Sequence, residues 1–165
     1  MLVVADASPF VGLIKVGCID ILPDLFGSVV IPPEVHGELL KPTQAFEVQM
    51  FATAPPTWLI VRAATSVERI PDLDAGERAA ISLAKELRAD LLLIDEMKGR
   101  AAAIERHLQT ARTAAVMKQA ADVGLIKDLA AVFEQLKRTN FRVPVRALDA
   151  LLGEHLRHLQ RPPGD

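Results

Sequence analysis

Short apolar runs without polar alternation recur along the chain, and two of them end at an aspartate. Residues 2–5 are followed by Asp6, and residues 91–94 are followed by Asp95. Because no polar residue interrupts these runs, each is typical of a strand buried on both faces of a parallel sheet. The carboxyl ends of such strands meet at one edge of the sheet, where ligands bind. The two aspartates are therefore expected to converge, either as a repulsive pair or as a cation site.

Strands and helix-like segments alternate through most of the sequence. Further strands are predicted at 29–31 and 58–61, with a weaker fifth strand at 109–110. Helices are predicted at 9–17, 19–25, 32–40, 43–53, 74–88, 96–107, 114–123, 128–138 and 145–159. Ser8 and Thr43 are both residues that commonly cap helices, and each is expected to cap the helix that follows it. Pro9 supports this for Ser8, because proline favours the first helical position. This order predicts an α/β sandwich whose mostly parallel central sheet has four to five short strands.

The composition is that of a globular protein with a sizeable core. The chain has 165 residues, of which 50% are hydrophobic and 4% aromatic. A single cysteine, Cys18, leaves no internal disulfide and favours a reducing compartment. No apolar stretch approaches the length of a membrane span, and the N-terminus lacks the basic segment of a signal peptide. We therefore expect a cytoplasmic protein that makes no use of a membrane.

Two regions are expected along the chain. Residues 1–140 are predicted to form the main domain, and residues 141–165 a C-terminal helix and tail that pack on that domain or on a partner. The last predicted helix carries a leucine stripe at helical spacing, formed by Leu148, Leu151, Leu152, Leu156 and Leu159. This stripe is typical of core packing, and it is also suited to a dimer or partner surface.

Charge is distributed unevenly. Residues 1–97 hold 7 Lys/Arg and 14 Asp/Glu, whereas residues 98–165 hold 12 Lys/Arg and 7 Asp/Glu. Solvated helix faces explain such a distribution, and charge alone favours that interpretation. An acidic metal site bordered by a basic rim for phosphates is the functional alternative. The overall net charge of −2 argues against a general polyanion binder.

Two further acids lie on inward faces of predicted helices. Glu38 is three residues beyond Val35, and Glu77 is four residues before Ile81. A carboxylate on an inward face needs a partner, because a lone buried charge is costly. With Asp6 and Asp95, these two acids make the set of oxygen ligands that a hard cation prefers.

Each of the four acids also has a simpler explanation. The stretch from Asp74 to Glu77 has the form of a capping box, in which Asp74 caps the helix and Glu77 reaches back. Asp6 and Asp95 can cap the segments that follow them, and Glu38 can be solvated. It is the combination of the four acids, and no single one of them, that favours a cation site.

Taken in order, these motifs resemble the PIN-domain family of metal-dependent ribonucleases. The matching segments are VVADASPF at 3–10, IPPEVHGEL at 31–39, LDAGERAAISLA at 73–84 and DLLLIDEMKGR at 90–100. The resemblance covers residues 1–138 and is closest to a prokaryotic subfamily related to the toxins of toxin–antitoxin pairs. It implies a three-layer α/β/α PIN-like sandwich.

The resemblance also implies a function and a site. Asp6, Glu38, Glu77 and Asp95 would be both the catalytic residues and the ligands of one or two Mg²⁺ or Mn²⁺ ions that promote hydrolysis of RNA. Candidate contacts to the RNA substrate are Ser8, Lys98, Arg100, Arg106 and Arg112. A small antitoxin protein and a second copy of the chain are the candidate protein partners.

Two departures from the family pattern leave other functions open. Residue 77 is a glutamate where the toxin ribonucleases often have aspartate, and the segment 111–115 lacks the glycine that is frequent there. A catalytically weak or inactive PIN-like module that binds nucleic acid or protein is the second interpretation. A phosphoryl-transfer or receiver domain ranks last, because the sequence has neither a D-x-D pattern at the first strand nor a later strand ending in lysine.

Overall fold

The computed structural model describes residues 1–164, and the chain divides into two compact units, Met1–Thr113 and Ala114–Asp165. The strands are β1 (Val3–Ala5), β2 (Val29–Ile31), β3 (Leu59–Val61), β4 (Leu91–Leu93) and β5 (Thr110–Ala111). The helices are α1 (Ala7–Lys15), α2 (Ile21–Phe26), α3 (Pro33–Leu39), α4 (Phe46–Thr53), α5 (Ala75–Leu87), α6 (Met97–Glu105), α7 (Thr113–Asp122), α8 (Leu129–Arg138) and α9 (Val145–Leu159).

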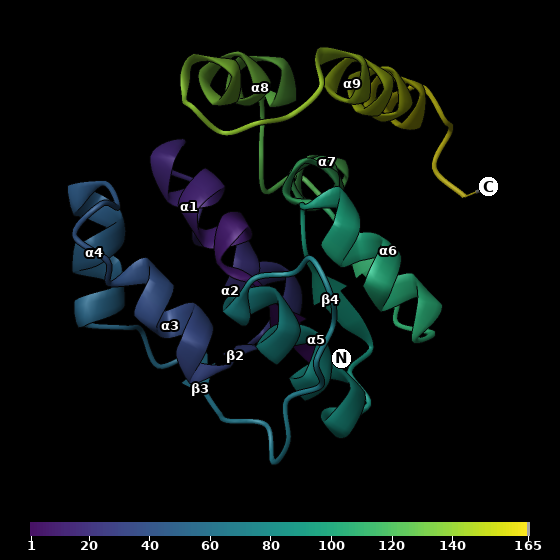
Figure 1. Cartoon of the computed structure of the whole chain (residues 1–165). Coiled ribbons are helices and arrows are strands. Elements are labelled where there is room, and N and C mark those ends of the chain that lie inside the picture. Colours follow the sequence, from purple (N-terminus) through teal and green to yellow (C-terminus); the bar gives the residue numbers. More distant parts are fainter. Residues whose placement is uncertain (165) are drawn as a thin grey trace. The chain divides into compact units, whose positions relative to one another are not determined.

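The first unit is built on one five-stranded sheet in which every pair of neighbouring strands is parallel. The strand order is β3-β2-β1-β4-β5, and helices flank the sheet (Figure 1). This arrangement confirms the predicted α/β fold with a parallel central sheet. From β1 the chain proceeds to β2 and β3, and from β4 it proceeds to β5 in the opposite direction. The carboxyl ends of β1 and β4 therefore flank the point where open parallel sheets bind ligands.

The sheet is held together by strands that are buried on both faces. All three residues of β1 and of β2 are buried, as are Leu92 and Leu93 of β4. Ala5 pairs with Leu93, and the Asp6 N–H donates to the Leu93 carbonyl at 2.9 Å. The continuous apolar runs are thus explained by burial on both faces. The same pairing fixes the position of Asp6 at the end of β1.

Two predicted helix starts are wrong. Helix α1 begins at Ala7 and not after Ser8, so Ser8 is its second residue and Asp6 occupies the N-cap position with extended backbone. Pro9 is tolerated at the third position because N–H groups of the first turn have no partner within the helix. Helix α4 begins at Phe46, because the chain first makes a turn in which the Gln44 N–H donates to the Lys41 carbonyl.

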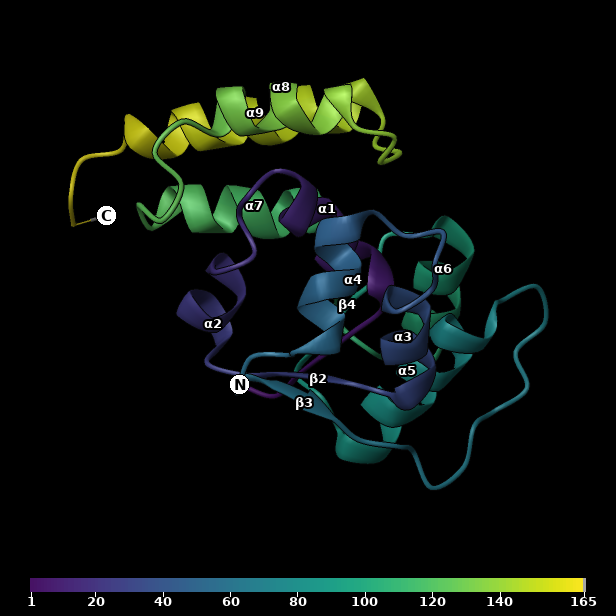
Figure 2. The same cartoon turned by 90° about the vertical axis from the view of Figure 1, so that its left-hand side faces the viewer.

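A long loop, residues 62–74, connects β3 to α5 and is tied to the following helix. Figure 2 shows it leaving the end of β3 and returning to α5. Thr65 donates from its backbone N–H (2.7 Å) and its hydroxyl (2.9 Å) to the Glu86 carboxylate. The Glu68 N–H donates to Ser82 Oγ at 2.9 Å, and Ile70 is buried. Although the loop lies largely at the surface, its course is therefore set by contacts to α5.

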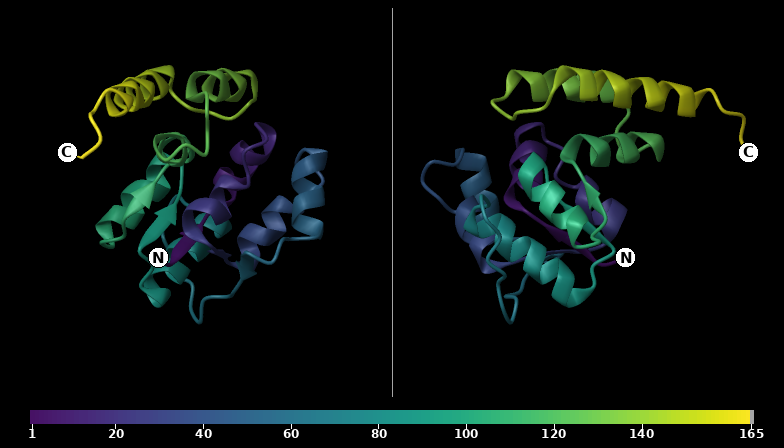
Figure 3. Two further views of the ribbon diagram at one scale, coloured as in Figure 1. Left: turned by 180° about the vertical axis from the view of Figure 1, so that it is seen from behind. Right: turned by 45° about the vertical axis from the view of Figure 1, so that its right-hand side comes forward.

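In the second unit α8 and α9 lie side by side (Figure 3). Asp122, at the end of α7, accepts from Lys118 Nζ at 2.7 Å and contacts His155 Nδ1 at the same distance. Leu148 of α9 is buried, whereas Leu156 is 50% and Leu159 63% exposed. The leucine stripe is thus only partly covered. None of the helices within residues 1–164 has the length and apolar content needed to cross a membrane.

Gly99 of α6 allows this helix to approach the end of β4, and this gives a stability prediction. A Cβ on Gly99 would lie 2.7 Å from Ile94 Cδ1, whereas a Cβ on the exposed Gly37 of α3 would meet nothing within 4 Å. We expect Gly99→Ala to lower the free energy of unfolding by ~1–3 kcal/mol through overpacking. The matched Gly37→Ala should raise it by ~0.5–1 kcal/mol through helix propensity. Thermal unfolding of both variants measures the difference, and equal Tm values would contradict the packing argument.

Candidate functional site

Carboxylates from three elements surround Gly76, in the first turn of α5. A Cβ placed on this glycine would lie 3.0 Å from Glu38 Oε2, 3.4 Å from Asp6 Oδ1 and 3.5 Å from Asp74 Oδ1. Gly76 is itself buried. Because it has no side chain, it leaves a small volume that acidic oxygens border. We call Asp6, Glu38, Asp74 and Glu77 the acidic cluster.

Asp6 is the most deeply buried acid of this cluster. Its side chain follows β1, the residue is only 4% exposed, and Oδ1 has no hydrogen-bond partner within residues 1–164. Burial raises the pKa of Asp6 to about 8, the backbone N–H of Ala7 opposes this shift, and the charges of the other three cluster acids add to it. In the free protein at neutral pH, the Asp6 carboxyl is therefore mostly protonated.

Glu77 and Asp74 form the capping box that their spacing predicts. The Glu77 N–H donates to Asp74 Oδ1 at 2.8 Å, and the Asp74 N–H donates to Glu77 Oε2 at 3.0 Å. Glu77 is nevertheless buried, and burial raises its pKa, with the charges of Asp74, Glu96 and Glu38 acting in the same direction. The local role as a cap and the membership of the acidic cluster therefore coexist in the same two residues.

Glu38 comes to the cluster from α3. Val35 and Leu39 on the same helix are buried, and they fix the helix so that the half-buried Glu38 side chain reaches the space beside Gly76. Burial raises the pKa of Glu38 and the charge of Asp74 raises it further, whereas Lys41 lowers it. The structure thus brings together three of the four acids predicted from the sequence.

The fourth predicted acid, Asp95, has a different set of partners. Its two oxygens accept from the Thr113 N–H at 2.9 Å and the Thr113 hydroxyl at 2.6 Å, so it stabilises the first residue of α7. Burial raises the pKa of Asp95, while the Thr113 hydrogen bonds and the charges of Arg112 and Arg100 lower it. The role of Asp95 as a cation ligand stays a prediction from the sequence.

The residues predicted to contact RNA differ in their burial and in their hydrogen-bond partners. Arg100 and Arg112 each have a buried Nε without a hydrogen-bond partner in the described part of the chain, and both act on Asp95. Lys98 is exposed, and Ser8 is half-buried. Arg106 binds Glu68 through two hydrogen bonds of 2.7 and 3.0 Å, so the expectation that it contacts RNA is not supported.

Asp74 and Gly76 belong to this site, although the sequence pattern assigns neither of them to it. Asp74 was interpreted only as a cap, because nothing local distinguishes a capping carboxylate from one that also faces a second acid. The signal for Gly76 was a glycine in the first turn of a helix, where it costs stability relative to alanine. Such a glycine indicates that the neighbouring space is needed by another group.

The chemistry of the cluster is that of a hard-cation site. Its donors are all carboxylate oxygens, which Mg²⁺ and Mn²⁺ prefer, and Asp6 Oδ1 is buried with no partner of its own. Within residues 1–164, no three His, Cys, Asp or Glu side chains are already arranged as a ligand set for a metal ion. Asp6, Glu38 and Glu77 therefore have the ligand chemistry of a divalent-cation site.

The chain matches a known family model and is similar to a solved structure. The family model DUF3368, described as a PIN domain, matches residues 2–156. Among solved structures, the chain is similar to the PilT N-terminus domain protein SSO1118 from the hyperthermophilic archaeon Sulfolobus solfataricus P2. The two share 22% sequence identity with a TM-score of 0.54, over 81% of this chain and 95% of that protein, which shows a common fold. No curated protein matches the chain.

The buried Asp6 gives a pH-dependent stability prediction. Its pKa is raised from 3.8 to about 8 in the folded state, so its contribution to stability is retained below about pH 4 and is lost as the pH rises through 8. We therefore compare the free energies of unfolding of Asp6→Asn and of the parent protein in EDTA. The difference between them, variant minus parent, should increase from pH 5 to pH 7.5 by roughly 2–3 kcal/mol, or 5–10 °C in Tm.

The matched control is Asp149→Asn, which removes an exposed carboxylate from α9. For this variant, thermal unfolding at pH 5 and at pH 7.5 should give the same stability difference from the parent protein. A difference between Asp6→Asn and the parent protein that is independent of pH would show that the Asp6 carboxyl is not under electrostatic stress.

Proposed function

The chain belongs to the PIN-domain family, whose members are generally nucleases, and we propose that it is a metal-dependent endoribonuclease. The proposed reaction is hydrolysis of an RNA phosphodiester, in which water adds across a P–O bond and leaves a phosphate monoester and a hydroxyl. PIN domains generally use Mg²⁺ or Mn²⁺, and these are the cations we propose for this chain.

One observation carries the proposal. Asp6 Oδ1, Glu38 Oε2 and Asp74 Oδ1 surround the same small space beside Gly76, and the Asp6 oxygen has no other partner in the described part of the chain. Burial and the neighbouring acids both raise the pKa of Asp6 and of Glu38, and a bound cation would relieve this cost. An arrangement that costs stability in the free protein is typical of a functional site.

The cluster residues would have distinct roles. Asp6, Glu38 and Glu77 are the proposed cation ligands, and Asp74 adds negative charge while its hydrogen bonds orient Glu77. A divalent cation held by these residues would supply a water of lowered pKa and would neutralise charge on the phosphodiester. Asp6 Oδ1 would hold a proton in the free protein and release it on cation uptake, so cation affinity should rise toward pH 8.

For Asp95 we propose a positioning role. Both of its oxygens are occupied by Thr113, and its charge acts on Arg100 and Arg112. These two guanidinium groups, together with Lys98 and Ser8, are the proposed contacts to RNA phosphates beside the cation. Burial lowers the pKa of Arg100, and the charge of Arg112 lowers it further, so an anion placed near both arginines would relieve their repulsion.

The proposal extends to the toxin of a toxin–antitoxin pair. The support is the outer part of α9, where Leu156 and Leu159 are exposed and would be covered by a small antitoxin protein or by a second copy of the chain. A toxin of this kind would arrest growth through the same acidic cluster that cleaves RNA. Growth arrest on expression, abolished by Asp6→Asn, is the observation that tests this extension.

Cleavage of RNA is the central test. We expect purified protein to cut RNA in Mn²⁺ or Mg²⁺ and not in EDTA, and we expect Asp6→Asn and Glu77→Gln to lose ~100-fold or more in rate. Glutamine at position 77 keeps the acceptor of the capping box, so this variant removes the charge and preserves the helix start. Quantitative gel analysis of single-stranded and structured RNAs measures the rates.

The control variant is Glu105→Gln, which removes an exposed carboxylate from α6. It should cleave at the parent rate. RNA binding without any cleavage in either metal would contradict the nuclease proposal and favour an inactive PIN-like binding module.

A second prediction separates the roles of Asp6 and Asp95. Mn²⁺ titration followed by electron paramagnetic resonance should give about tenfold or greater loss of affinity for Asp6→Asn and less than about twofold loss for Asp95→Asn. Asp95→Asn should instead lower the free energy of unfolding by ~1–2 kcal/mol, because Thr113 loses an acceptor.

Thr113 supplies the matched variants for this test. Thr113→Val removes the hydroxyl at nearly constant volume and should reproduce the stability loss, whereas Thr113→Ser retains the donor and should not. An Mn²⁺ affinity that falls as far in Asp95→Asn as in Asp6→Asn would establish Asp95 as a cation ligand instead.

A further inference from the structure

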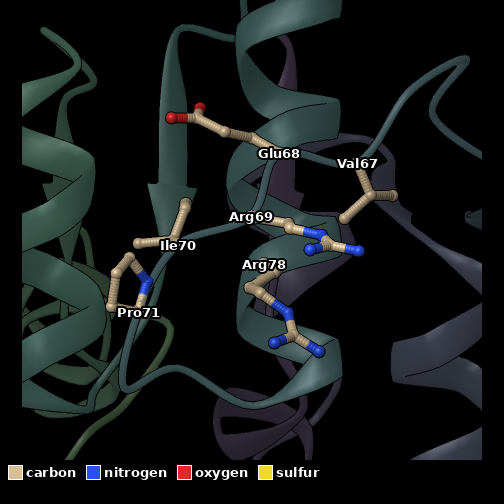
Figure 4. Close-up of a pocket in the computed structure, with 6 residues that line it drawn as sticks. All are labelled: Val67, Glu68, Arg69, Ile70, Pro71 and Arg78. Atoms are coloured by element: carbon tan, nitrogen blue, oxygen red, sulfur yellow. The ribbon is translucent and has the colours of Figure 1, made fainter.

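The loop that leads into α5 forms a pocket with two arginines that have no acidic partner among its lining residues. The cavity has a volume of about 510 Å³ and is lined by Val67, Glu68, Arg69, Ile70, Pro71 and Arg78. Cavities of this size hold small organic ligands. Figure 4 shows the Arg69 and Arg78 side chains projecting to the same side of α5, while the Glu68 carboxylate points away from them.

Glu68 does not neutralise this pair of guanidinium groups. Its carboxylate binds Arg106 at 2.7 Å and Lys85 at 3.1 Å, and these hydrogen bonds lower its pKa to about 2. Within the described part of the chain, no ion pair is formed by Arg69 or Arg78. The pocket therefore presents two positive charges that are free to bind an anion.

The contacts of Glu68 also fix the position of its neighbour Arg69. The Glu68 N–H donates to Ser82 of α5, and its carboxylate reaches Lys85 of α5 and Arg106 at the end of α6. The backbone at Arg69 is therefore held next to α5 before any ligand binds. A fixed backbone lowers the conformational entropy that is lost when the side chain binds a ligand.

The chemistry of the pocket favours a nucleotide over a simple anion. Arginine binds phosphate through two parallel N–H groups and stacks on planar rings, so the pair can engage both parts of a nucleotide. Val67, Ile70 and Pro71 supply an apolar wall. A carboxylate or a free phosphate would use the arginines and leave this wall without a function.

The pocket adjoins the acidic cluster along the chain. Arg78 is the residue after Glu77, and its N–H donates to the Asp74 carbonyl at 3.1 Å. The other wall of the pocket, residues 67–71, ends three residues before Asp74. The first turn of α5 thus carries Glu77 of the acidic cluster and Arg78 of the pocket at consecutive positions.

We propose that the pocket of Arg69 and Arg78 binds a nucleotide of the RNA chain next to the phosphodiester held at the acidic cluster. This inference rests on the proposed nuclease function, and it adds a substrate contact in the half of the sequence where acids are in excess. The pocket would set the direction in which RNA crosses the cluster and would contribute to binding and not to the chemical step.

The test uses the double variant Arg69→Gln/Arg78→Gln in the full chain. Fluorescence anisotropy with a short single-stranded RNA is measured in EDTA, where no cation-dependent cleavage occurs, over about 50–200 mM KCl. We expect Kd to rise about tenfold and the slope of log affinity against log salt to fall by roughly 0.7–1.4, for one or two lost phosphate contacts. Arg69→Lys/Arg78→Lys should keep the slope and lose affinity, because lysine keeps the charge but not the paired donors.

Arg142→Gln/Arg146→Gln is the matched control, since it removes the same charge from exposed positions outside the first unit. Its Kd should change less than about twofold. An unchanged Kd and slope in Arg69→Gln/Arg78→Gln would overturn the proposal. Loss of binding to a polyglutamate peptide, with RNA binding intact, would also overturn it and assign the pocket to an acidic protein segment.

Failure of this inference can be distinguished from failure of the nuclease function. If the parent protein cleaves RNA and the double variant cleaves it with the same KM, the pocket is not a substrate contact although the enzyme is confirmed. If the parent protein does not cleave RNA but binds it through Arg69 and Arg78, the nucleotide pocket is supported and the nuclease proposal is wrong.

Discussion

The burial of the Asp6 carboxyl beside three other acids is the constraint around which the site is built. Removing a carboxylate from water and placing like charges near it both oppose ionisation, and Asp6 keeps one oxygen without a partner within residues 1–164. The sheet must compensate for this cost. It does so through β1 and β2, which are wholly buried, and through the backbone bond from Asp6 to Leu93.

Local structure and site chemistry use the same residues. The capping box of Asp74 and Glu77 starts α5, and it also holds two carboxylates in a fixed orientation at the rim of the cluster. Gly76, between them, weakens the helix and leaves the space that Glu38 and Asp6 border. A first turn that is imperfect as a helix is therefore well suited to gather acids from three elements.

Two pairs of arginines belong to the same unit as this acidic centre. Arg100 and Arg112 lie beside Asp95, and Arg69 and Arg78 lie in the pocket before and within α5. Other basic groups are bound by acids, as Arg106 and Lys85 are by Glu68. Although the first part of the chain is rich in acids, Arg69 and Arg78 form no ion pair among residues 1–164, and both remain available to an anion.

The sequence by itself determined the parallel α/β fold and the strand-end position of Asp6. Apolar runs without alternation are typical of strands covered on both faces, as β1 and β2 are, although the edge strand β3 keeps Ile60 and Val61 exposed. The capping box was equally local and was predicted correctly. Only the tertiary structure decided which acids meet. Asp95 accepts from Thr113, and Asp74 lies with Asp6 and Glu38 beside Gly76, because these contacts depend on how α3 and α5 pack and on where α7 begins, and no spacing along the chain records the distances between side chains of separate elements.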